Sequence, residues 1–60
     1  PALTPDEAGL LGCFRKSDPL SVETLREITG LDPGELAALL LGLELAGALR
    51  QLPGNRYMKL

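Results

Sequence analysis

Residues 21–47, SVETLREITGLDPGELAALLLGLELAG, carry the signals that decide the fold. Ser21 predicts a helix start because its hydroxyl can cap free backbone N–H groups, and Gly30 predicts the left-handed residue that ends this helix. Asp32 and Pro33 then predict a second start, with Pro in the first helical position. Two helices joined by so tight a connection predict a helix-turn-helix, with helices over 21–29 and 33–46.

An earlier helix is predicted on the N-terminal side of this stretch. Thr4 and Glu7 have the spacing of a capping box, in which each side chain satisfies the other's backbone N–H. We expect this helix over 4–16, with Leu10, Leu11 and Phe14 on one face. Asp18-Pro19 breaks the pattern, and Leu20 is expected to form a short extended link that adds a minimal strand.

On the C-terminal side the pattern changes to that of a hairpin. Residues 48–52 and 56–60 predict two short strands, and the turn residues between them include Pro53 and Gly54. The predicted order is helix, link, helix, turn, helix and hairpin. The fold class is therefore mostly α with a small β part: a winged helix, with a three-helix core that contains the helix-turn-helix and a C-terminal β-hairpin wing.

Length and composition limit the function. The 60 residues form one domain, 1–60, which we expect to be a fragment of a longer chain without its N-terminal domains, because it begins at Pro1. Cys13 is the only cysteine and there is no histidine, so we expect no metal, no cofactor and no enzyme activity. The lone cysteine favours a cytoplasmic location. The sequence contains no apolar run of about 18 residues, so it predicts no membrane span.

Three stretches resemble the C-terminal winged helix of the DprA (Smf) family of DNA-processing proteins. They are PLSVETL at 19–25, LELAG at 43–47 followed by Leu49, and GNRY at 54–57. The resemblance implies a parent protein that binds single-stranded DNA during natural transformation and loads a RecA-type recombinase onto it. In that family single-strand binding belongs chiefly to a Rossmann-like domain, so the resemblance implies an accessory role here.

The second helix of the helix-turn-helix has an unusual outer face. Four leucines (Leu36, Leu39, Leu40 and Leu43) are expected to face the core, because they cluster on one side of a helical wheel. The opposite side has no side chain able to form a bidentate contact with a base edge. It offers small residues and leucines, of which we predict a protein-interaction surface of Gly34, Ala38, Leu41, Gly42 and Leu45.

The same face is also compatible with compositional drift, with Leu41 tucked under the wing, and with direct contact to DNA. The partner of the interaction hypothesis is a second copy, the core of the parent or a recombination protein. The alternative function is an auxiliary nucleic-acid module through the wing, with contacts from Arg50, Arg56, Tyr57 and Lys59. Residues 17–47 hold six acids and one arginine, which disfavours tight binding to phosphates.

Overall fold

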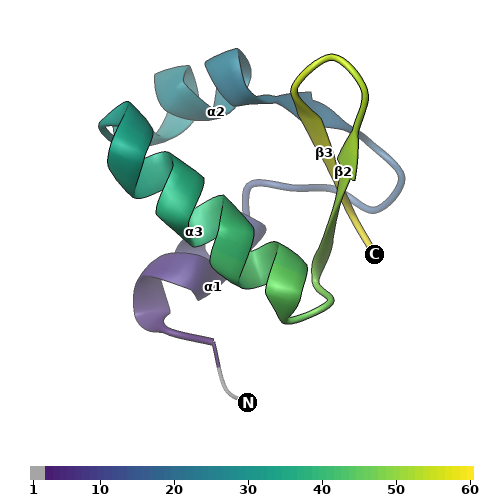
Figure 1. The fold of residues 1–60 in the computed structure, drawn as a ribbon, viewed down its shortest axis with the longest axis horizontal. Helices are drawn as coiled ribbons and strands as arrows, with labels where there is room; N and C mark the ends of the chain where they lie inside the picture. The colour runs from purple at the N-terminus through teal and green to yellow at the C-terminus, as the bar shows by residue number, and fades with distance from the viewer. Residues whose placement is uncertain (1–2) are drawn as a thin grey trace.

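The computed structural model describes residues 3–60, so the expectation that rests on Pro1 lies outside it. The elements follow in the order α1 (Pro5–Leu11), β1 (Leu20–Ser21), α2 (Val22–Thr29), α3 (Pro33–Leu45), β2 (Leu49–Leu52) and β3 (Arg56–Lys59). The three helices gather on one side, and the β2–β3 hairpin stands at the other (Figure 1). This arrangement is a winged helix, as the sequence predicts.

The small sheet connects the hairpin to the helices. Its strands are antiparallel in the order β1-β3-β2, with Leu20 paired to Tyr57, so the predicted third strand is present. The hairpin turn needs backbone with positive φ at Gly54 (84°) and Asn55 (56°), which glycine and asparagine adopt more readily than other residues. The Val22 backbone N–H donates to the Asn55 carbonyl oxygen at 2.9 Å, which joins the wing turn to the first residue of α2.

The helix starts follow the capping residues predicted from the sequence. The Thr4 hydroxyl accepts from the Glu7 backbone N–H at 3.2 Å, and a Glu7 carboxylate oxygen accepts from the Thr4 backbone N–H at 3.0 Å. Ser21 caps α2 by accepting from Thr24, and Asp32 caps α3 by accepting from the first-turn amides. Each cap satisfies backbone groups that a helix leaves free at its N-terminus.

The first helix is shorter than predicted, which corrects the expected span of 4–16. It ends at Leu11, and the chain continues through Gly12 into turns whose N–H groups reach back only three residues, including Phe14 N–H to Leu11 O at 3.1 Å. These tight turns bring Phe14 into the core without helical backbone. Arg15 and Lys16 therefore lie outside the last turn of α1. Their backbones form isolated β-bridges, Arg15 with Asp18 and Lys16 with Lys59.

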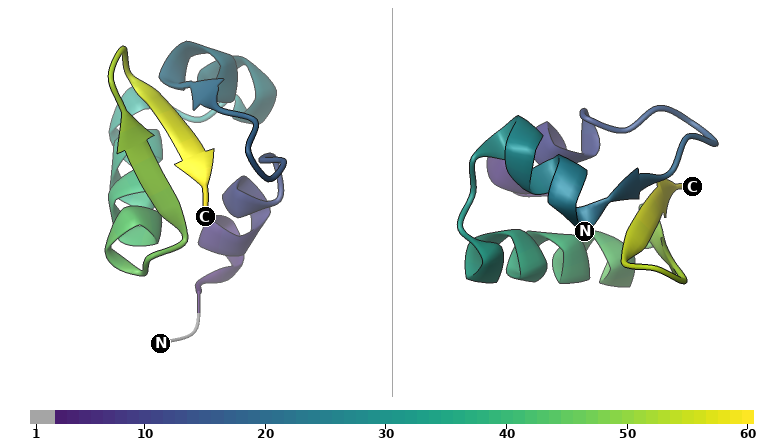
Figure 2. Two further views of the ribbon diagram at one scale, coloured as in Figure 1. Left: turned by 90° about the vertical axis from the view of Figure 1, so that its right-hand side faces the viewer. Right: turned by 90° about the horizontal axis from the view of Figure 1, so that it is seen from above.

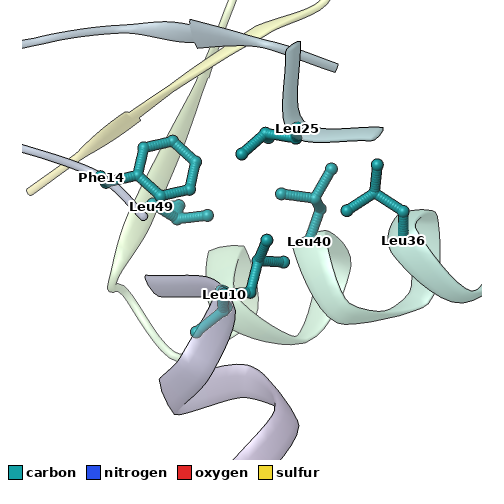
Figure 3. Packing of buried hydrophobic residues seen from close by; sticks show 7 residues of the cluster. Leu10, Phe14, Leu25, Leu36, Leu40 and Leu49 are labelled. Carbon is teal, nitrogen blue, oxygen red and sulfur yellow. The ribbon is translucent and has the colours of Figure 1, made fainter. Parts of the chain in front are cut away.

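The core contains one side chain or more from every helix and from β2. Leu25, Leu36 and Leu43 are completely buried, and Phe14 and Leu49 belong to the same cluster (Figure 3). Among residues 3–60 the buried cluster is Leu10, Phe14, Leu25, Leu36, Leu40, Leu43 and Leu49. Three of the four α3 leucines predicted for the core are buried, and the fourth, Leu39, is half-buried against it.

The spacing of Val22, Leu25 and Ile28 predicts an apolar stripe along α2, and Ile28 departs from it. It is 55% exposed, whereas Thr29 is half-buried and its hydroxyl donates to the Leu25 carbonyl oxygen at 2.7 Å. The same hydroxyl accepts from the Leu31 backbone N–H at 3.2 Å. Because Thr29 satisfies its polar group locally, it can take the inward position that the sequence pattern assigns to Ile28.

Candidate functional site

The outer face of α3 exposes two large leucines. Leu41 is 55% exposed and Leu45 is 80% exposed, as the helical wheel predicts. Gly34, Ala37 and Ala38 are exposed on the same helix. The hypothesis that Leu41 lies under the wing is therefore wrong. We call the exposed set Gly34, Ala38, Leu41 and Leu45 the outer α3 face.

No other element among residues 3–60 covers Leu41 and Leu45 of the outer α3 face. Seen from above, α3 forms one long side of the molecule, and α1 and α2 both lie on the same side of it (Figure 2, right). Leucines occupy both the buried and the exposed sides, so α3 has no single apolar face. Helices of that kind normally lie fully inside a protein. On a surface helix the same pattern is typical of a partner site.

Gly42 differs from the other residues predicted for this surface. It is half-buried, and a Cβ atom there would collide with the Glu7 carboxylate of α1. The missing side chain thus lets Glu7 reach α3 while it completes the cap of α1. The wheel places Gly42 outward because it takes no account of α1, which crosses α3 on that side.

The wing separates the four residues predicted to contact nucleic acid. Leu49 is buried and opposes Lys59, whereas Arg50 opposes Met58. Neighbouring side chains alternate between the two faces of a strand, so Arg50 points away from the buried side of Leu49. Met58 opposes Arg50, and Arg56 lies two residues from Met58 on β3, so Arg50 and Arg56 share the outward face. Tyr57 and Lys59 lie on the face that turns toward the helices, and Tyr57 packs against the core. The outward face therefore carries two cations, with no aromatic ring beside them.

Arg56 is already engaged by the hairpin. Its Nε donates to the Pro53 carbonyl oxygen at 3.3 Å. Arg50 and Arg56 stand diagonally across β2 and β3, at the spacing of about 7–8 Å that is usual for such pairs. The pair can neutralise at most two phosphates on one face of the wing.

A groove that no sequence pattern indicates lies between α1 and α3. It has a volume of about 360 Å³. Its walls come from both helices and from the turn after α2, and they include Asp6, Gly9, Leu31, Ala38 and Leu39. The signal that could have suggested it is Gly9, a glycine inside a short helix with no turn to explain it.

The family comparison agrees with the geometry. A family model described as the DprA winged helix domain matches residues 1–55 of the 60. The chain belongs to the DprA winged-helix family. The resemblance carried by the three sequence stretches is thereby confirmed. Comparisons with curated proteins and with solved structures gave no match.

The DprA winged-helix domain offers few polar clusters for other chemistry. Across residues 3–60, no three side chains among its cysteine, aspartates and glutamates are placed to hold a metal ion. None of the helices described is long and apolar enough to cross a membrane. The features that distinguish the surface are the outer α3 face, the two-arginine face of the wing and the groove between α1 and α3.

Proposed function

We propose that this DprA winged-helix domain is a protein-interaction module that docks through its outer α3 face. The observation that carries the proposal is the exposure of Leu41 and Leu45 on the helix that reads DNA in many helix-turn-helix proteins. The outer face of that helix presents no side chain here that can form a bidentate contact with a base edge, and its ionisable residues, Glu35 and Glu44, are both acidic. Apolar area with negative charge favours a protein partner over a phosphate backbone.

The wider role follows from family membership and is part of the same proposal. The parent protein acts in the cytoplasm during natural transformation, binds single-stranded DNA and loads a RecA-type recombinase onto it. The domain is accessory: it holds a second copy, the parent's own core or a recombination partner against the site where DNA is processed. We assign it no catalytic activity, since the chain has no histidine to activate Cys13 or a hydroxyl group.

The alternative function is an auxiliary nucleic-acid module through the wing. The observation that favours it is the placement of Arg50 and Arg56 on one outward face. This alternative and the interaction proposal predict different sensitive residues. If the wing is the site, replacing Arg50 and Arg56 should weaken nucleic-acid binding more than replacing residues of the outer α3 face.

Association of the 60-residue chain tests the interaction proposal when the partner is a second copy. Sedimentation velocity over a range of concentrations should show self-association that Leu41→Lys removes, because a charge in an apolar contact loses its hydration. Ile28→Lys is the matched control, since Ile28 has the same 55% exposure but lies on α2. It should leave association unchanged.

The same pair of variants tests the other two partners. In the full-length parent, Leu41→Lys should weaken the docking of this domain on the parent's core. Limited proteolysis of the segment that joins the domain to the core measures this change. Against a purified recombinase, titration calorimetry should show the same ranking of the variants. If Leu41→Lys changes none of the three associations, the proposal is wrong and the apolar face is compositional drift.

A further inference from the structure

The groove between α1 and α3 is a second surface, which meets the outer α3 face at Ala38. Its volume of about 360 Å³ lies within the range of about 300–1,000 Å³ that is usual for ligand pockets. Leucines from α1, α3 and the connecting turn form its apolar walls. The lining residues are Pro5, Asp6, Gly9, Leu10, Thr29, Leu31, Glu35, Ala38 and Leu39.

Gly9 keeps this groove open. Glycine inside a helix destabilises it relative to alanine, so its presence there needs a reason. Packing does not supply one, because a Cβ atom at Gly9 would have no atom of residues 3–60 within 4 Å beyond its chain neighbours and the backbone of its own helix. Since Gly9 lines the groove, the volume that a side chain would fill is the groove itself.

The charges around the groove have one sign. Asp6 and Glu35 are the ionisable residues of its lining, and both are exposed. No lysine or arginine of the described part of the chain lines it. An occupant must therefore supply apolar area for the leucines and positive charge for the two carboxylates. A nucleic acid does not supply the positive charge, because its backbone is anionic.

We propose that the groove binds a short protein segment in which leucine-like side chains stand next to lysine or arginine. The apolar side chains would pack on Leu31 and Leu39 in the space left by Gly9, and the cations would pair with Asp6 and Glu35. Charge complementarity commits the site to a basic segment. The site shares Ala38 with the outer α3 face but includes neither Leu41 nor Leu45, the residues on which the proposed function rests. The inference therefore goes beyond the proposed function.

A titration with model peptides tests the chemistry. The probe is acetyl-Arg-Leu-Leu-Arg-amide, added to the 60-residue chain and followed by amide chemical shifts. We expect saturable shifts centred on Gly9, Leu31 and Ala38, and weaker binding as salt increases. The matched peptide acetyl-Glu-Leu-Leu-Glu-amide should not bind. Equal shifts with both peptides would overturn the charge argument.

Variants of the chain locate the site. Asp6→Asn and Glu35→Gln should each weaken binding about twofold to fivefold, the range of an exposed ion pair, whereas Asp18→Asn, away from the groove, should not. Gly9→Leu should remove binding while circular dichroism still shows a folded chain. Leu41→Lys should leave peptide binding unchanged. A failure of the proposed function at the outer α3 face can therefore be distinguished from a failure of the groove proposal. Binding that survives Gly9→Leu or both carboxylate variants overturns the proposal.

Discussion

Leu41 and Leu43 are two residues apart on α3 and have opposite environments. Leu41 is 55% exposed, and Leu43 is completely buried. A lysine at position 41 can keep its charge in water, so Leu41→Lys should change the free energy of unfolding by less than about 1 kcal/mol. Leu43→Lys should cost several kcal/mol, because it removes core packing and buries a charge. Chemical denaturation with circular dichroism measures both variants.

The unfolding of these two variants also tests whether Leu41 lies on the surface. A domain of this size has little stability to lose, so Leu43→Lys should leave the chain largely unfolded at room temperature. If Leu41→Lys unfolds the chain as well, Leu41 belongs to the core. The outer α3 face would then not exist as described.

At the scale of elements, the wing is held by its turn and by a link to α2. Gly54 has a φ of 84°, and the neighbouring Asn55 carbonyl accepts from the Val22 backbone N–H. Gly54→Ala places a Cβ atom in the left-handed region and should destabilise the chain by about 1–2 kcal/mol. Because the turn is linked to α2, amide exchange should quicken at Val22 as well as within β2 and β3.

Gly9→Ala is the control for the turn, since it makes the same change of residue inside α1. There the backbone is helical and a Cβ atom would have open space. The variant should stabilise the chain by about 0.5–1 kcal/mol, as expected for alanine replacing a glycine inside a helix. Equal effects at the two glycines would mean that the backbone conformation of the turn does not matter.

At the scale of the whole molecule, the charges are segregated. The helix-turn-helix carries the excess of acids, and Arg50 and Arg56 lie on the wing. Two phosphate contacts on single-stranded DNA release about 1.4 counterions, at about 0.7 for each contact. Fluorescence anisotropy should therefore show a dissociation constant above about 100 µM near physiological salt, with a log–log salt slope near about −1.4.

The two arginines should each account for half of that slope. Arg50→Ala and Arg56→Ala should reduce it by about 0.7 each, whereas Arg26→Ala, on α2, should leave it unchanged. Tight binding that persists in both wing variants would contradict the electrostatic argument. It would place the DNA contact on a surface other than the wing.

The sequence alone was enough to predict the winged-helix order, the caps at Thr4, Ser21 and Asp32, and the exposure of Leu41 and Leu45. These features depend on contacts three or four residues apart, which the chain encodes locally. Only the tertiary structure decided how the elements meet. Crossing helices placed Glu7 against Gly42 and opened the groove beside Gly9, and strand register put the predicted wing contacts on opposite faces. Such contacts join residues far apart in the chain, so no local spacing signals them.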